Sequence, residues 1–198
     1  MNFLPDNVYH IFNQGNNHQS IFSCDGEYEI FLRLVRENIF AHSEIISWCL
    51  MLNHFHLMVY TDERVLNIKK QGGLQIDDLT NGIRKLLSGY ARIYNSRHQR
   101  SGSLFRQKTK SKCLSDYNIK YHQNLNDYYF NCFHYIHQNS YVAGLVKRIE
   151  DWKFSSFKDY AGLRNGTLCN MKLAAKFCSY EPETFIETTY QIIEDFEF

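Results

Sequence analysis

Residues 50–60 read LMLNHFHLMVY and place two histidines, His54 and His56, one bulky residue apart at the start of a hydrophobic alternation. In a strand, successive side chains point to opposite faces, so the two imidazoles share one face of a sheet. The bulky residues between and after them share the other face, which helices can bury. Two imidazoles held side by side on an uncovered face suit one metal ion, although such pairs are also ordinary strand residues. The stretch therefore predicts a strand that carries a candidate metal pair.

The length and composition favour one globular domain of ordinary size. Of the 198 residues, 44% are hydrophobic and 16% are aromatic, which is enough for a real core and argues against disorder. The six cysteines form no CxxC pair. The N-terminus has no signal-peptide pattern, and no apolar run approaches the roughly 18 residues of a membrane span. We therefore expect a cytoplasmic protein whose cysteines are reduced core thiols.

The formal net charge of +1 hides an uneven charge distribution along the chain. Residues 84–115 contain nine Lys or Arg and no acid, whereas residues 181–198 contain six acids and no Lys or Arg. Aromatic residues are mixed into the basic stretch, and this mixture is typical of surfaces that follow a phosphate backbone and stack unpaired bases. The alternative is a solvated helix face followed by a charged loop. The residues expected to bind nucleic acid are Arg84, Lys85, Arg92, Arg97, Arg100, Arg106, Lys108, Lys110 and Lys112.

The order of the predicted elements indicates an α+β fold. Strands are expected at residues 8–14, 45–50, 54–60 and 104–114, the last being a strand or an extended basic segment; helices are expected at 25–41 and 77–95. This β-α-β-β-α-β order is the ferredoxin-like or RRM-like arrangement, an antiparallel sheet with helices on one face and the other face free.

The rest of the chain is expected to complete one domain over residues 1–162 and an extension over 163–198. Residues 151–162 should pack back on the domain because their aromatic residues are spaced for burial. The extension should end in an acidic helix at 185–196, which would be either a capping helix or a shield for the basic surface.

A third helix is predicted at residues 126–140 (NDYYFNCFHYIHQNS). Tyr135 and Asn139 are four residues apart, so they stand one above the other on the same helix face. Asn139 could give a carbonyl oxygen to a metal while Tyr135 presents its hydroxyl beside it. A tyrosine that flanks an apolar stripe is also an ordinary half-buried packing residue. His134 and Gln138 are expected on the outer side of the helix.

The remaining histidines and the tryptophans receive structural assignments. His10 is expected to be structural, because it lies on a different strand from the metal pair. The histidines expected at the surface, in contact with DNA at most, are His18, His98, His122, His134 and His137, and the tryptophans expected in the core are Trp48 and Trp152.

Four blocks of sequence, taken in order, resemble those of the single-tyrosine HUH transposases, and most closely their REP-associated tyrosine transposase branch. The blocks are YHIFNQGNN at 9–17, NHFHLMV at 53–59, SGSLFR at 101–106, and YIHQN at 135–139 running into AGLV at 143–146. The resemblance covers about residues 8–160. The chain departs from the family at Gln14 or His18, where Arg is common, and at Ser140, where Pro commonly follows the asparagine.

This resemblance implies a metal-dependent DNA transposase that cuts and rejoins hairpin-containing single-stranded DNA through a 5′-phosphotyrosine. It implies His54 and His56 as metal ligands, Asn139 as the third ligand and Tyr135 as the nucleophile, with Mg²⁺ or Mn²⁺ as the ion and a homodimer as the assembly. Nearby tyrosines compete for the role of nucleophile: Tyr117, Tyr121, Tyr128 and Tyr129.

Two other functions stay open at this point. A β-α-β-β-α-β sheet with exposed aromatic residues is also an RNA-binding architecture, so the chain could be a non-catalytic RNA- or DNA-binding module. A metal phosphodiesterase that uses water would release its products without a protein–DNA link.

Overall fold

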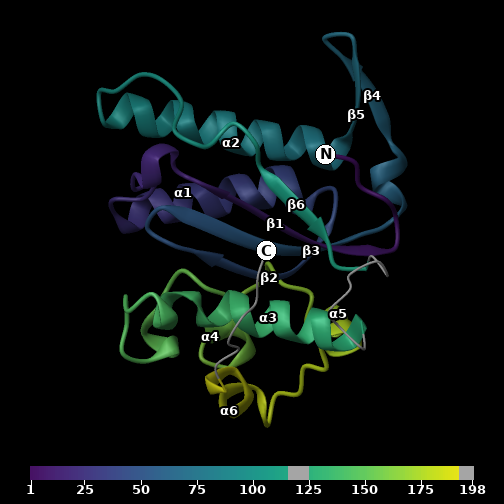
Figure 1. The fold of residues 1–198 in the computed structure, drawn as a ribbon, viewed down its shortest axis with the longest axis vertical. Coiled ribbons are helices and arrows are strands. Elements are labelled where there is room, and N and C mark those ends of the chain that lie inside the picture. The colour runs from purple at the N-terminus through teal and green to yellow at the C-terminus, as the bar shows by residue number, and fades with distance from the viewer. Residues whose placement is uncertain (116–124, 192–198) are drawn as a thin grey trace.

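The computed structural model describes residues 1–115 and 125–191, which form an α+β fold with a central antiparallel sheet between two helical layers (Figure 1). The sheet has four strands in the order β2-β3-β1-β6. Their bounds are β1 Asn7–Gln14, β2 Glu44–Leu50, β3 His54–Thr61 and β6 Lys110–Cys113. With one helix after β1 and another before β6, this arrangement confirms the predicted β-α-β-β-α-β fold.

The first helical layer consists of α1 (Asp25–Val35), which continues into a π-helical turn (Arg36–Phe40), and α2 (Asp78–Arg97). The alternation of β3 turns Phe55 and Leu57 toward these helices, where both are buried in the main core. α2 begins where the Asp77 side chain accepts a hydrogen bond from the Thr80 backbone N–H. The sequence therefore predicted both helices correctly and their ends to within a few residues.

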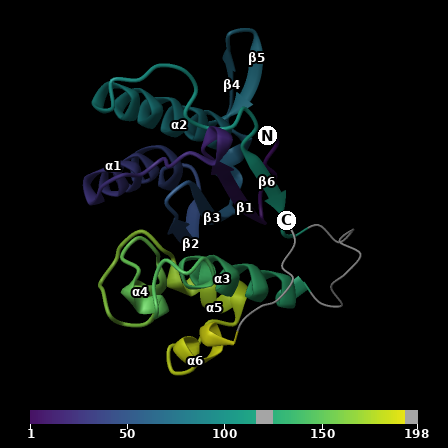
Figure 2. The same cartoon turned by 60° about the vertical axis from the view of Figure 1, so that its left-hand side comes forward.

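The second helical layer covers much of the sheet face that we expected to be free, so that expectation was wrong. It consists of α3 (Leu125–Val142), α4 (Phe157–Tyr160), α5 (Met171–Cys178) and α6 (Phe185–Tyr190), and Figure 2 shows it on the opposite side of the sheet from α1 and α2. Met58 of β3 and Cys49 of β2 are buried with Cys132 and Phe133 of α3 in a second core. The apolar stripe of α3 is removed from water by packing against this face of the sheet.

The outer side of α3 is buried as well, which corrects the predicted exposure of three polar residues. His134 is only 2% exposed and shares a 2.8 Å hydrogen bond between its Nδ1 and Thr189 Oγ1 in α6. Gln138 donates to the Thr189 backbone oxygen at 2.6 Å, and buried His137 lies 2.7 Å from the Ser156 hydroxyl. The acidic C-terminal helix expected at 185–196 is described only as far as residue 191, and within that range it packs beneath α3.

The structure contains a short hairpin that the sequence pattern did not predict. β4 (Ile68–Gln71) and β5 (Leu74–Asp77) pair with each other and project from the body next to the N-terminus of α2 (Figures 1 and 2). Gly72 and Gly73 form its turn with φ angles of 58° and 83°, a conformation that glycine adopts without strain. Most residues of these two strands are polar or lysine, so no alternation of apolar and polar residues predicted the strands.

Three short 3₁₀ segments complete the described elements, at Asn16–His18, Glu63–Leu66 and Ile149–Asp151. Between α2 and β6, only Lys110–Cys113 is strand, which is shorter than the expected 104–114. The preceding residues still follow the edge of β1, because Gly15 bridges to Phe105 and the Arg106 N–H donates to the Gln14 oxygen at 2.9 Å. A side chain at Gly15 would overlap the Gln19 backbone oxygen, so this tight exit from β1 requires glycine.

The outer edge of β2 is covered by the segment that follows α3. Ser156 N–H donates to the Trp48 oxygen at 2.9 Å, and Leu50 N–H donates to the Phe154 oxygen at 2.8 Å. Arg164 holds this segment in place through two hydrogen bonds to the buried Asp159 carboxylate, at 2.5 and 2.9 Å. Residues 151–162 therefore pack back on the domain as predicted.

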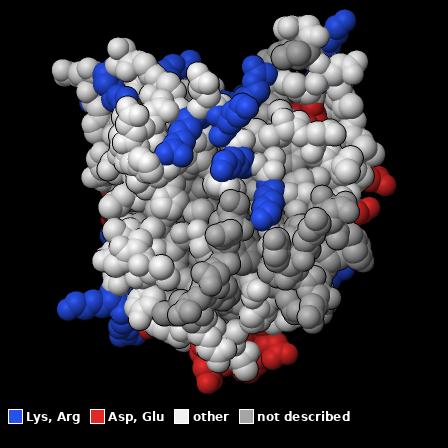
Figure 3. Space-filling model, in the orientation of Figure 1, with Lys and Arg blue, Asp and Glu red and all other residues white. Residues whose placement is uncertain are grey.

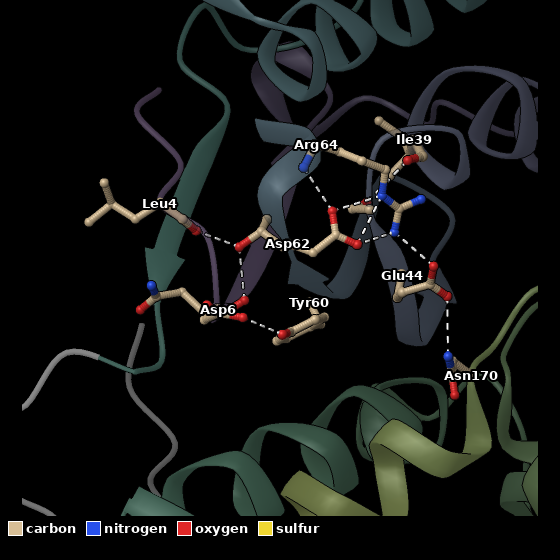
Figure 4. Close-up of polar contacts among 11 residues, drawn as sticks. Leu4, Asp6, Ile39, Glu44, Tyr60, Asp62, Arg64 and Asn170 are labelled. Carbon is tan, nitrogen blue, oxygen red and sulfur yellow. Dashed lines mark hydrogen bonds and ion pairs between the residues drawn. The ribbon is translucent and has the colours of Figure 1, made fainter. Parts of the chain in front are cut away.

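A polar network fixes the end of the sheet farthest from His54 (Figure 4). The Arg64 guanidinium donates to Glu44 at 2.7 Å and to Asp62 at 2.7 Å, and Asn170 donates to the other oxygen of Glu44 at 3.2 Å. These contacts join the end of β3, the start of β2 and the approach to α5. The Arg64 side chain lowers the pKa of Asp62, because the cation stabilises the ionised carboxylate.

All six cysteines are free thiols in the described residues; Cys24 is exposed, whereas Cys49, Cys132 and Cys178 are buried. Trp48 is buried and Trp152 is partly buried against both cores. Within residues 1–115 and 125–191, no helix has the length and apolarity needed to cross a membrane. His122, Tyr117 and Tyr121 lie outside the described residues.

Candidate functional site

The two histidines of the His-X-His motif stand together at the beginning of β3, on the side of the sheet that faces α3. Their ring centroids are 5.0 Å apart and the rings are nearly perpendicular, at 88°. His56 is 4% exposed and His54 is partly buried. The alternation of the strand therefore places both imidazoles on one face, as the sequence predicted.

α3 brings Tyr135 and Asn139 to the same place. The Tyr135 ring meets the His56 ring edge to face, with centroids 5.7 Å apart and an angle of 89° between the planes. Asn139 donates its amide N–H to the Tyr135 backbone oxygen at 2.8 Å, and its side chain is close enough to the His54 ring to raise the pKa of that imidazole as a hydrogen-bond partner. Because the amide nitrogen is engaged within the helix, the amide oxygen is the atom turned toward His54. Four residues from two of the four sequence blocks, His54 and His56 of the second and Tyr135 and Asn139 of the fourth, therefore lie together.

Two further residues, His10 and Asn53, contact the histidines, and no sequence pattern had placed either of them at the site. His10 in β1 lies with its Nε2 2.8 Å from His56 Nδ1, and the two rings are stacked within 12° of parallel. Asn53, at the turn between β2 and β3, has its side-chain oxygen 2.6 Å from His54 Nδ1. The strand register explains the first contact, since His10 lies opposite Met58 and Phe12 lies opposite His56.

Burial controls the protonation of these groups. It lowers the pKa of His54, with a hydrogen bond to Asn139 acting in the opposite direction, and it lowers the pKa of His56 well below its usual value, with His10 and His54 adding to the effect. Burial lowers the pKa of His10 to about 3, with help from the Lys112 charge. The imidazoles are therefore neutral at pH 7 and able to offer lone pairs. Burial raises the pKa of Tyr135, so its phenol keeps its proton unless positive charge approaches.

The open end of the site is rimmed by polar residues from two other blocks. Gln14 pairs with His54 across the β1–β3 ladder, and its side-chain amide lies 2.8 Å from His18 Nδ1. Arg106 donates to His18 Nε2 at 3.1 Å. All four sequence blocks therefore converge on one end of the sheet, although they are spread over more than a hundred residues.

The nine basic residues expected to bind DNA fall into separate groups. Arg84, Lys85 and Arg106 line a groove of about 540 Å³ between α2 and residues 103–109. Figure 3 shows Lys and Arg side chains gathered over this side of the molecule. Lys110 and Lys112 extend from β6 on the same sheet face as the histidines, and their ammonium groups lie 5.7 and 5.2 Å from the ring centroids of Phe12 and Tyr128.

The other basic residues lie farther along α2 and in the loop that follows it. Arg92 and Arg97 are exposed on α2, Lys108 is exposed in the loop, and the Arg100 guanidinium lies 5.7 Å from the Tyr94 ring centroid. A strand that binds in the groove would pass from α2 toward β6 and the histidine face.

The structure also separates the tyrosines that compete for the role of nucleophile. Tyr128 and Tyr129 are buried in the second core, and the Tyr129 hydroxyl donates to Ser115 at 2.8 Å. Among the described tyrosines of this region, Tyr135 is the one whose ring contacts His56.

The donor atoms at the site are unusual for a metal centre in one respect. Over residues 1–115 and 125–191, no three His, Cys, Asp or Glu side chains are grouped so that they could hold a metal ion. A set of three ligands that is drawn from the described residues and contains His54 and His56 must therefore include another donor type, such as the amide oxygen of Asn139.

The comparisons with known proteins add a likeness of fold. The solved structure of a REP-associated tyrosine transposase bound to a REP hairpin is similar to this chain, with a TM-score of 0.56. The two sequences are 18% identical, and the match covers 85% of this chain and 90% of the other. A scan against models of protein families finds no match, and a search of the curated proteins also finds none. At this identity the likeness establishes a common fold.

Proposed function

We propose that this chain is a single-strand DNA endonuclease and strand transferase of the tyrosine transposase type. Its substrate would be hairpin-containing single-stranded DNA, and its intermediate a 5′-phosphotyrosine on Tyr135. The observation that carries the proposal is the contact of Tyr135 and Asn139, on one helix, with His56 and His54 on the sheet. The common fold with a transposase that binds a REP hairpin supports a distant relation to that family.

A divalent metal fits the residues at this site. A neutral imidazole carries one N–H, yet His54 faces two amide oxygens, one from Asn53 and one from Asn139. The His54 ring can donate to only one of these two oxygens. Its other nitrogen and the second oxygen then face each other with a lone pair each, and a cation bound between them would accept both lone pairs. His54, His56 and Asn139 would hold Mg²⁺ or Mn²⁺; two nitrogen donors favour Mn²⁺ over Mg²⁺. When bound, the ion supplies Lewis-acid stabilisation of the phosphate charge.

The reaction that suits these residues is an in-line attack by the Tyr135 oxygen on a phosphodiester. One phosphorus–oxygen bond forms to the phenol oxygen, and the bond to the 3′-oxygen breaks, so the products are a 5′-phosphotyrosine and a free 3′-hydroxyl. The phenol proton is released and the 3′-oxygen takes one up. The reverse attack rejoins strands without another energy source, which is why a covalent tyrosine suits transposition.

The phenol starts from a raised pKa, because burial disfavours the phenolate. Positive charge close to Tyr135 is therefore needed for attack, and the neutral histidines do not provide it. Lys112 lies on the same sheet face, and its ammonium group reaches the ring of Tyr128. We expect the bound ion to be the main source of this charge.

Non-specific contacts to the DNA backbone would come from the nine basic residues described above. The groove beside α2 lies outside the sheet face that α3 covers. This arrangement weakens the alternative of an RRM-like binding module, because such modules stack bases on an open sheet. The homodimer implied by the sequence resemblance remains a prediction, which light scattering of the purified protein would test.

The decisive experiment is an adduct assay with a hairpin oligonucleotide that has single-stranded flanks and a label at its 3′ end. With Mn²⁺, we expect a labelled protein–DNA adduct that survives denaturing electrophoresis. Y135F should abolish it, and H54A should reduce it strongly. Y141F, which removes a hydroxyl from the same helix away from the histidines, is the matched control and should retain the adduct.

Other outcomes would reject the proposal. Cleaved DNA without any adduct would indicate a phosphodiesterase that uses water. Binding of many different hairpins, independent of metal and without cleavage, would indicate a binding module. An adduct that persists in Y135F would move the nucleophile to another tyrosine.

A further inference from the structure

Each histidine of the candidate metal pair makes a hydrogen bond through its Nδ1 atom to a residue behind it. His54 Nδ1 lies 2.6 Å from the Asn53 side-chain oxygen, and His56 Nδ1 lies 2.8 Å from His10 Nε2. A neutral imidazole has one N–H and one lone pair, so the partner at Nδ1 decides which nitrogen can bind a metal.

At His54 the direction of this hydrogen bond is set by the amide. Asn53 donates its side-chain N–H to the His18 backbone oxygen at 3.3 Å, so its oxygen is the atom that faces His54. An amide oxygen can only accept. His54 Nδ1 therefore carries the proton, and the lone pair lies on Nε2.

At His56 the partner is another imidazole, which can donate or accept. His10 is fully buried in β1, and its ring stacks within 22° of parallel on Phe12 as well as on His56. This packing leaves the ring little freedom to turn. If His10 Nε2 accepts, His56 Nδ1 carries the proton, and both histidines of the pair present Nε2 in the same way. If His10 donates instead, the lone pair of His56 lies on Nδ1 and accepts from His10, so it is not available to a metal.

We propose that His10 is a positioning residue for metal binding: its Nε2 accepts a hydrogen bond from His56 Nδ1 and so directs the His56 Nε2 lone pair toward the ion. The inference rests on the proposed function, because it assumes that His54 and His56 hold a metal. Partners of this kind behind a metal-binding histidine fix its tautomer and ring orientation, and their loss typically weakens metal binding by about 10- to 100-fold.

The use of a neutral acceptor has a chemical consequence. Where a carboxylate stands behind a ligand histidine, it adds negative charge to the centre. Here the partners are an imidazole and an amide, and the ligands themselves are neutral, so the full charge of a divalent ion would remain available to the phosphate.

The test compares two substitutions at His10. H10Q can place an amide oxygen where Nε2 stood and so keep an acceptor for His56. H10L fills similar space without an acceptor. H134L is the matched control, because His134 is also buried and hydrogen-bonded but belongs to the packing between α3 and α6. Thermal unfolding of the three variants shows how much each loses in stability alone.

Two measurements report on the histidine itself. In metal-free protein, ¹H–¹⁵N correlation spectra of the imidazoles should show His56 as the Nδ1–H tautomer in the parent, H10Q and H134L, and as a different mixture in H10L. In a Mn²⁺ titration followed by electron paramagnetic resonance, H10L should bind about 10- to 100-fold more weakly than the parent. H10Q and H134L should bind within about threefold of it.

The outcomes separate this inference from the proposed function. If H54A abolishes Mn²⁺ binding while H10L binds as the parent does, His10 only packs the core and the inference is wrong. An Nε2–H tautomer of His56 in the parent would overturn it equally. If the parent binds no Mn²⁺ at all, or binds it as tightly in H54A, the metal site of the proposed function fails and the inference fails with it.

Discussion

Replacing His134 with asparagine should reduce the sensitivity of the fold to acid. The ring is 2% exposed, lies between Phe130, Phe133 and Phe185, and faces His137 as its titratable neighbour. Burial lowers its pKa from 6.5 to about 4. The unfolded chain therefore takes up a proton near pH 6.5, whereas the folded chain does so only near pH 4, so stability falls as the pH drops between these values. From pH 7 to pH 5 the linkage relation gives a loss of about 2 kcal/mol from this residue.

The assay is urea unfolding at a series of pH values, followed by circular dichroism. H134N can keep the hydrogen bond, because its amide superposes on the Nδ1 side of the ring that meets Thr189. The parent should lose about 2 kcal/mol more than H134N between pH 7 and pH 5. H18N, which removes an exposed histidine, is the control and should follow the parent. Parallel curves for the parent and H134N would refute the reasoning, since they would mean that His134 titrates alike in the folded and unfolded chains.

Three further predictions follow from packing and charge. In chemical unfolding, G82A should destabilise the protein by about 1–3 kcal/mol, because a Cβ there would overlap the Asn38 backbone oxygen. The Cβ of G89A, on the same helix, meets no atom within 4 Å, so this variant should be more stable than the parent by about 0.5–1 kcal/mol. R164M should cost about 3–5 kcal/mol, since it leaves a buried carboxylate without its guanidinium; unchanged unfolding midpoints would contradict this. Neutralising Lys110 and Lys112 should weaken binding of a hairpin oligonucleotide and lower its salt dependence by about one to two units in a log–log plot, and an unchanged slope would exclude both from the DNA contact.

The sequence predicted those parts of the fold that depend on local periodicity. The alternation after His54 identified β3 and its buried face, and the three-and-four spacing identified α2 and α3. The spacing of Tyr135 and Asn139 also predicted that both would lie on one face of α3, as they do. These features are determined within a few residues of the chain, where side-chain direction follows directly from secondary structure.

What the sequence could not predict depends on contacts between distant segments. His10 meets His56 because β1 and β3 pair in one register, and a shift by one residue would have turned His10 to the other face. The same limitation explains the outer side of α3. His134 and Gln138 are polar, and their spacing alone indicates a solvent face; α6, more than fifty residues further on, supplies the hydrogen bonds that let them be buried.

These two results together explain how α3 is held at the candidate site. One side of the helix presents Tyr135 and Asn139 to the histidines, and a second side, about 100° around the helix, is fixed by hydrogen bonds to α6 instead of facing water. A phenol that attacks in line must keep its distance from the phosphate within a fraction of an ångström, and a helix restrained on both sides moves less than one restrained on one side. Under the proposed function, the polar outer side of α3 would therefore help to position Tyr135 and Asn139.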